Sequence, residues 1–334
     1  MGDSVIAQSS PRQQTRGLSF APVGWLLLCG WLLCGCGTLS NSDALLTARE
    51  LKSDAARLSL VRFSPDGTKL AAGGANGEVL VWSDVSGWPT KLESGRAAPL
   101  ISLTWSPDGL LAATDVELGF VGWRFGQTNP DRVELPGLSA PAVCLAFRPN
   151  VKRLELVIGS RDGSLIFLEA RGLKQLKPEH RGAVKQVAYS PDGQSLITAG
   201  ADGQLIWRDA GSRKVVHAVK AHDTEISRLL LSPDGRQLIT GDWNGRITVW
   251  DAASHKSVRT LDQPEAVSGL DWLRGQLVSA SWDGSLRLWD VSSGRCLRTI
   301  DTGQPLHDLS VDPRTQRIAT VSLDRSVRLW EVPK

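Results

Sequence analysis

A short turn motif recurs along this sequence at nearly constant spacing. The tetrapeptide Ser-Pro-Asp-Gly stands at 64–67, 106–109, 190–193 and 232–235, and Arg-Pro-Asn at 148–150 lies in the same phase. Proline presets the first corner of a turn, aspartate caps it, and glycine accepts a positive φ. An apolar or aromatic residue stands just before each position of the series, at intervals of about 40 residues, a period typical of repeat architectures: Phe63, Trp105, Phe147, Tyr189, Leu231, Trp272 and Val311.

Strand signals surround each of these turns. An aliphatic residue lies two positions earlier in all seven copies, which predicts a strand with one buried face. Downstream come pairs that favour tight hairpin turns, such as Asn76-Gly77, Asp162-Gly163 and Asp202-Gly203. Four short strands in each of seven units over residues 45–334 predict an all-β, seven-bladed β-propeller.

The last unit lacks its outer strand, because the chain stops shortly after Trp330. Residues 44–52 are not used by the first complete unit, and Leu45–Leu51 within them could supply the missing strand. An open ring would leave unpaired strand edges at both ends. We therefore expect the N-terminal segment to complete the last blade and close the ring.

The turn, the pitch and a terminal Trp-Asp pair together resemble the WD-repeat family. Tryptophan is unusually frequent, with 13 Trp against 6 Phe and 1 Tyr, as one repeated structural position would require. The resemblance implies a hydrogen-bonded network of histidine, serine or threonine, turn aspartate and tryptophan in each blade. Its expected members are His180, Thr198 and Asp202; His222, Thr240, Asn244 and Trp250; Ser279, Asp283 and Trp289; and Thr320, Asp324 and Trp330.

Blades 2 to 4 depart from this pattern. Leu168 and Arg208 fall at the tryptophan position, with Phe167 and Trp207 one residue early. The second unit has no Asp-Gly turn between Asp115 and Trp123. We expect these blades to be less regular.

The first 42 residues read as an export signal. Arg12 and Arg16 precede a charge-free stretch at 17–42, whose apolar heart, Val23–Leu33, would span only about 16 Å as a helix. That length suits a signal peptide. Leu33-Cys34-Gly35-Cys36 resembles a bacterial lipobox, which implies removal of residues 1–35, lipidation of Cys36 and a short tether at 36–44. An uncleaved signal anchor and a plain secretory signal are the alternatives, and each exports the propeller.

The sequence contains few residues that suggest catalysis or ligand binding. A net charge of +3, from 38 basic and 35 acidic residues, gives no case for nucleic acid. No nucleophile elbow, phosphate loop or metal-binding motif is present, so we expect neither cofactor nor metal. Asp271 and Asp308 are expected to line the central channel, with His307 pointing away from Asp308. Cys144 and Cys296 are expected to be unpaired.

The residue before each tight-turn Asp or Asn lies, by resemblance to WD-repeat proteins, on the top face and contacts partners. Trp243, Trp282 and Leu323 occupy it in three successive blades, and Arg161 occupies it in blade 3. Exposed tryptophans are common in binding hot spots; the alternative is that each indole packs on its own blade. The sequence therefore predicts a non-enzymatic, exported, membrane-tethered scaffold, monomeric within a larger complex, that binds a protein or peptide. A hydrolase or quinone-dependent dehydrogenase at the channel mouth is the alternative.

Overall fold

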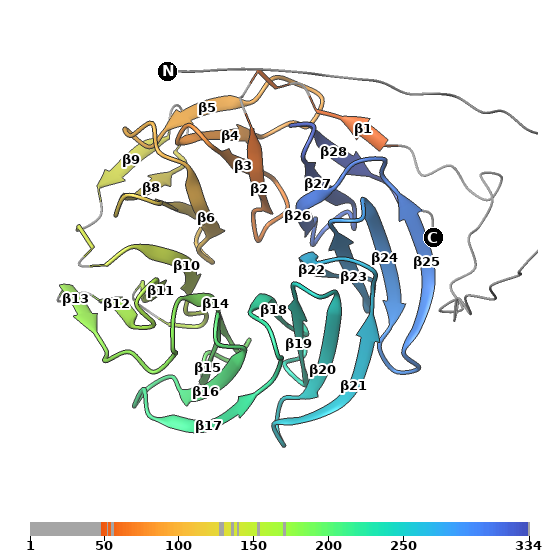
Figure 1. Ribbon diagram of the computed structural model, residues 1–334. Coiled ribbons are helices and arrows are strands. Elements are labelled where there is room, and N and C mark those ends of the chain that lie inside the picture. Colours follow the sequence, from red (N-terminus) through yellow and green to blue (C-terminus); the bar gives the residue numbers. More distant parts are fainter. Residues whose placement is uncertain are drawn as a thin grey trace, which may run out of the picture. The chain divides into compact units, whose positions relative to one another are not determined.

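The computed structural model describes residues 48–51, 53–54, 57–126, 130–134, 137–138, 140–151, 154–169 and 172–332. The expected signal segment at 1–35 and tether at 36–44 lie outside them. The described residues form 28 strands and no helix, arranged as seven four-stranded antiparallel sheets around a central axis (Figure 1). The prediction of an all-β, seven-bladed propeller is confirmed. Within the described ranges, no helix is long and apolar enough to cross a membrane.

Each of the first six blades takes four consecutive strands, the first innermost. Blade 1 comprises β2 (Leu58–Phe63), β3 (Leu70–Gly74), β4 (Glu78–Trp82) and β5 (Thr90–Glu93); blade 2, β6 (Leu100–Trp105), β7 (Leu110–Asp115), β8 (Phe120–Arg124) and β9 (Asp131–Glu134); blade 3, β10 (Ala142–Phe147), β11 (Leu156–Ser160), β12 (Leu165–Glu169) and β13 (Gly172–Gln175).

The later blades follow the same order. Blade 4 comprises β14 (Val184–Tyr189), β15 (Ser195–Gly200), β16 (Gln204–Asp209) and β17 (Val215–Lys220); blade 5, β18 (Ile226–Leu231), β19 (Gln237–Asp242), β20 (Arg246–Asp251) and β21 (Lys256–Asp262); blade 6, β22 (Val267–Leu273), β23 (Gln276–Ser281), β24 (Ser285–Asp290) and β25 (Arg295–Asp301); blade 7, β26 (Leu306–Val311), β27 (Ile318–Ser322), β28 (Val327–Trp330) and β1 (Ala48–Glu50).

The N-terminal strand closes the ring, as predicted. In blade 7 the strand order is β26-β27-β28-β1, and Ala48, Arg49 and Glu50 lie opposite Trp330, Leu329 and Arg328. The backbone N–H of Leu51 then donates to Val327 O at 2.8 Å, and the leucine side chain is buried. Residues 44–47 and 52 of the expected strand segment lie outside the described residues.

The repeated turn motif joins the first two strands of a blade. In blade 1 the Ser64 hydroxyl donates to Asp66 Oδ1 (2.6 Å), and the Gly67 N–H donates to Ser64 O (2.8 Å). Gly67 has a φ of 64°, and a side chain there would meet the Asp312 carboxylate. The turn therefore needs glycine for both backbone conformation and space.

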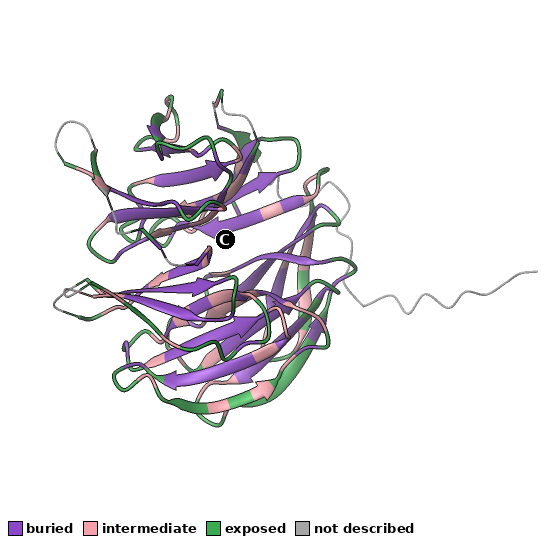
Figure 2. Cartoon of the chain, turned by 60° about the vertical axis from the view of Figure 1, so that its left-hand side comes forward, coloured by how far each residue is buried: buried purple, intermediate pink, exposed green. Residues whose placement is uncertain are grey.

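Hydrophobic cores lie between neighbouring blades and not within one sheet. One core joins Val79 and Val81 of blade 1 to Leu103 and Trp105 of blade 2. The second and third strands of most blades are largely buried, the innermost strand is partly buried, and the outermost strand is exposed (Figure 2). Burial on both faces explains why the second strands, such as β3 and β11, have few polar residues, whereas the innermost strands alternate between buried and partly buried residues.

The irregular blades keep four strands by local substitutions. Leu168 and Arg208 pair with Leu156 and Leu196, the register at which Trp250 pairs with Leu238, so they do occupy the tryptophan position. In blade 2 the buried Asp115 builds the missing turn, since its Oδ1 accepts the N–H groups of Glu117 and Gly119, each at 2.8 Å.

Candidate functional site: the top face and the central channel

Hydrogen-bonded clusters fix the loops of one face of the propeller. In blade 4, the His180 Nδ1 lies 3.1 Å from Asp202 Oδ1 and its Nε2 lies 2.9 Å from Thr198 Oγ1. Burial lowers the pKa of His180. Burial alone would raise the pKa of Asp202, but backbone N–H donors from Arg181 and Gln204 outweigh it and hold that pKa low. The structure thus brings together the three residues expected there.

In blade 5, Asp242 and not Asn244 binds the histidine. The His222 Nδ1 lies 2.9 Å from Asp242 Oδ2, and its Nε2 lies 2.7 Å from Thr240 Oγ1. The Trp250 N–H also donates to Thr240 Oγ1, at 2.9 Å. The prediction that Asn244 joins this cluster was wrong, because the carboxylate that contacts His222 belongs to Asp242, two residues before Asn244. Asp115 of blade 2 and Asp242 of blade 5 occupy the same register position at the end of their strands. Both aspartates were therefore visible in the sequence as an alternative to the Asp-Gly turn.

Blades 6 and 7 keep the hydrogen bond from tryptophan to serine or threonine but lack the histidine. The Trp289 N–H donates to Ser279 Oγ (2.9 Å), which donates to Gln263 Oε1 (2.8 Å). Gln263 stands in for the absent histidine and was missed in the sequence. In blade 7 the Trp330 N–H donates to Thr320 Oγ1 at 2.8 Å.

The turn aspartates of these two blades bind arginines instead. Asp283 accepts from Arg287 at 2.6 Å, and Asp324 accepts from Arg328 at 2.5 Å. Neither carboxylate is joined to Ser279 or Thr320, because no histidine bridges them. The tight turns are therefore pinned by ion pairs within one blade.

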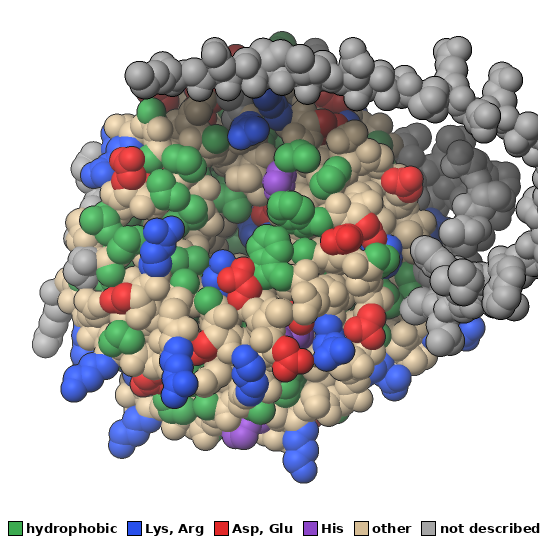
Figure 3. Space-filling model, in the orientation of Figure 1, with side chains coloured by type: hydrophobic (Ala, Val, Ile, Leu, Met, Phe, Trp, Pro, Cys, Tyr) green, Lys and Arg blue, Asp and Glu red, His purple; other side chains and the backbone are tan. Residues whose placement is uncertain are grey.

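Three apolar side chains stand on the turns that these clusters hold. Trp243 lies between β19 and β20, Trp282 between β23 and β24, and Leu323 between β27 and β28; they are 42%, 42% and 56% exposed. We call these three residues the tryptophan patch. Hydrophobic side chains gather near the centre of the face seen in Figure 3. Arg161, on the β11–β12 turn of blade 3, is also exposed.

The indoles of the patch contact each other across two blades. The Trp243 and Trp282 rings lie 5.6 Å apart between centroids at 64°, and Trp282 meets the His307 ring at 5.8 Å and 90°. Edge-to-face geometry of this kind is favourable for aromatic pairs. The His307 ring thus packs against the patch and is not among the residues that line the channel cavity.

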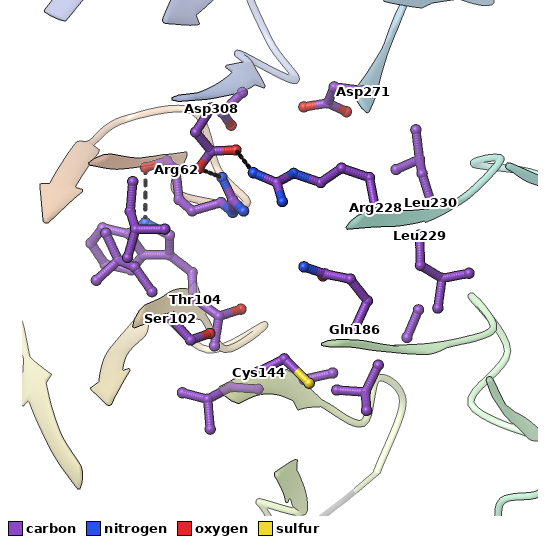
Figure 4. A pocket seen from close by; sticks show the side chains of 18 of the residues that line it. Arg62, Ser102, Thr104, Cys144, Gln186, Arg228, Leu229, Leu230, Asp271 and Asp308 are labelled. Carbon is purple, nitrogen blue, oxygen red and sulfur yellow. Dashed lines mark hydrogen bonds and ion pairs between the residues drawn. The ribbon is translucent and has the colours of Figure 1, made fainter. Parts of the chain in front are cut away.

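The central channel contains a cavity of about 470 Å³ lined by the innermost strands (Figure 4). The buried Asp308 is approached by Arg62 and, at 3.7 Å, by Arg228, and it accepts the Val61 N–H at 3.1 Å. Asp271 lies beside Asp308, on the innermost strand of the neighbouring blade 6 (Figure 4). Both aspartates line the cavity, as expected.

Asp271 has an unusual proton affinity. Burial raises its pKa to about 6, although the carboxylate accepts the N–H groups of Val311 (2.7 Å) and Trp272 (2.8 Å). The Cys144 thiol on the cavity wall is free, and burial raises its pKa to about 12. Cys144 is thus unpaired as expected, whereas Cys296 is disulfide-bonded, which corrects the expectation for that residue. Among the described residues, no group of three or more His, Cys, Asp or Glu could hold a metal ion.

Comparison with known proteins agrees with this geometry. The sequence matches the family "WD domain, G-beta repeat" at residues 52–83, 213–251, 255–290 and 294–331, and the "Anaphase-promoting complex subunit 4 WD40 domain" at 168–230. The matched segments of the propeller are WD40 repeats. The matched segments include blades 5 to 7, which carry the tryptophan patch.

Relatives of this WD40 propeller are distant. Actin-interacting protein 1 of Drosophila melanogaster is 29% identical over 48% of this chain and 27% of its own length. Protein FIZZY-RELATED 3 of Arabidopsis thaliana is 26% identical over 48% of this chain and 34% of its own length. The chain therefore matches about a third or less of these relatives.

A solved structure shares the fold. The β-propeller domain of Cps50 (Swd1) from Myceliophteria thermophila superposes with a TM-score of 0.75 at 17% identity. The superposition covers 86% of this chain and 99% of that domain. This likeness concerns the propeller architecture.

Proposed function

We propose that this WD40 propeller is a non-enzymatic scaffold that binds a protein or peptide through its top face. The observation that carries the proposal is the exposed edge-to-face pair of Trp243 and Trp282. Exposed apolar side chains in contact usually mark an interaction surface, and tryptophan is enriched among binding hot spots. The ring is rigid before binding, so little conformational entropy is lost when a partner docks.

The names of the relatives support a protein partner. Actin-interacting protein 1 is named for an interaction with another protein, and one matching domain is named for a subunit of a complex. From these names we take for this chain only the class of partner, which is a protein. The propeller acts as a single ring within a larger complex.

The proposal includes export and a lipid anchor. The lipobox-like sequence ending at Cys36 supports removal of residues 1–35 and acylation of Cys36. Because Cys144 is free, these two steps would leave Cys296 without its disulfide in the mature chain. Glycine at position 37 resembles lipoproteins of an outer membrane, and the cell membrane is the alternative. Eight residues, 37–44, would reach at most roughly 28 Å when extended, so the propeller would work close to the bilayer.

The top-face proposal is tested with Trp243→Ala/Trp282→Ala. Trp88→Ala is the matched control, because Trp88 is 66% exposed on the β4–β5 loop at the opposite face. Proteins crosslinked to the tagged chain in native membranes are quantified for each variant, and melting temperatures are recorded. We expect the double variant alone to lose its partners at an unchanged melting temperature. Equal capture by all variants, or a large stability loss in the double variant, would contradict the proposal.

A further inference from the structure

A second, smaller hollow lies beside the tryptophan patch. It has a volume of about 310 Å³, and Trp243 forms part of its wall. Ile101, Val143 and Gln186 line both this hollow and the channel cavity, so the two adjoin. A volume at the lower end of the range for ligand pockets suits one or two side chains and not a folded domain.

Three cationic side chains line this hollow: Arg161, Lys185 and Arg228. None of the described residues that line it is acidic. Nearby carboxylates neutralise part of the charge, since Lys185 lies 3.4 Å from Glu225 and Arg228 lies 3.7 Å from Asp308.

Donors remain available despite these ion pairs. The exposed Arg161 side chain makes no ion pair or hydrogen bond with the described residues. The Arg228 Nε is buried and lacks an acceptor in the described part of the chain. Figure 4 shows the Arg228 side chain extending toward Asp308 in the adjoining channel cavity. A buried donor without an acceptor costs free energy, so an incoming acceptor would be favoured.

We infer that the hollow binds an acidic side chain of a partner peptide whose neighbouring apolar side chain packs on the Trp243–Trp282 pair. A guanidinium favours a carboxylate by charge and by paired hydrogen bonds. The indole surface beside it favours an apolar residue. The inference rests on the proposed function and specifies the chemistry of the segment recognised.

The test is a selection of random peptides displayed on phage against the immobilised full-length chain. We expect enrichment of peptides in which Asp or Glu adjoins a large apolar residue. The selected peptides are synthesised, and their dissociation constants are measured for the unmodified chain and for Arg161→Glu. Reversing the charge should weaken binding at least about tenfold.

Arg236→Glu is the matched control, because Arg236 is an exposed arginine on the β18–β19 turn of the opposite face. It should bind the selected peptides like the unmodified chain. Peptides that need Trp243 but carry no acidic residue and tolerate Arg161→Glu would overturn this inference and leave the proposed function standing. Failure to enrich any peptide, or enrichment of basic peptides, would overturn it as well, and crosslinking in native membranes tests the proposed function separately.

Discussion

Arg49 of β1 lies opposite Leu329 of β28, so the two ends of the propeller meet in one antiparallel sheet. β1 is the edge of that sheet and has only three ladder positions. The buried Leu51 continues the contact and packs in the core between blades 7 and 1 with Leu58 and Leu329. Closure therefore depends on a short ladder and one well-buried leucine.

Deleting residues 44–52 is expected to give insoluble protein, because the outer edge of β28 and an apolar core become exposed. Leu51→Ala, a milder change, should lower the free energy of unfolding by about 3 kcal/mol. Urea denaturation measures this, and Arg49→Ala, whose side chain is exposed, should stay close to the unmodified chain. A soluble deletion variant that unfolds cooperatively would contradict the closure.

The threonine hydroxyls of blades 4 and 5 should differ in their contribution to stability. Thr240 Oγ1 contacts both His222 and Trp250, whereas Thr198 Oγ1 contacts His180. Thr240→Val leaves two buried polar groups unsatisfied and should cost about 3 kcal/mol, against about 1.5 kcal/mol for Thr198→Val. Chemical denaturation measures both, with the exposed Thr260→Val as control. Equal losses would show that the second contact adds nothing.

The fold was predictable because the same pattern of turns and strands recurs in most of the seven units. Turn chemistry, apolar alternation and spacing agree in most units, so the missing Asp-Gly turn of blade 2 did not change the prediction. The three-residue strand β1 was predictable for another reason: the seventh unit has sequence signals for three strands, and a blade needs four.

The details of the clusters depended on contacts between distant residues. An aspartate two positions from its expected place reaches the same histidine, so the pattern favoured Asn244 where Asp242 binds. Gln263 satisfies the Ser279 hydroxyl in place of a histidine, and no local signal marks it. The sequence predicted that Trp243 and Trp282 lie on neighbouring blades. It did not predict the edge-to-face contact of their rings, because the packing of the two blades sets the ring orientation.

Asp271 should make the stability of the propeller depend on pH. Its pKa is about 6 in the folded chain, above the ordinary value of 3.8. A raised pKa means that its contribution is fully present below about pH 3.8 and is lost as the pH rises through 6. Asp271→Asn cannot ionise, so its stability relative to the unmodified chain should increase between pH 4 and pH 7. Denaturation at several pH values measures the difference, and a difference that stays constant with pH would refute the assignment.

Cys36→Ser should release the protein from the membrane if Cys36 is acylated. Acyl chains anchor a protein through the free energy of burying their methylene groups, about 0.8 kcal/mol for each, and the substituted chain has no attachment point for them. The variant should move from the detergent-rich to the aqueous phase in cloud-point partitioning and should fail to incorporate labelled palmitate. Cys34→Ser, which changes the neighbouring cysteine, should retain both properties. Detergent-phase partitioning of both variants would favour an uncleaved signal anchor, because the apolar segment would then hold the protein without lipid.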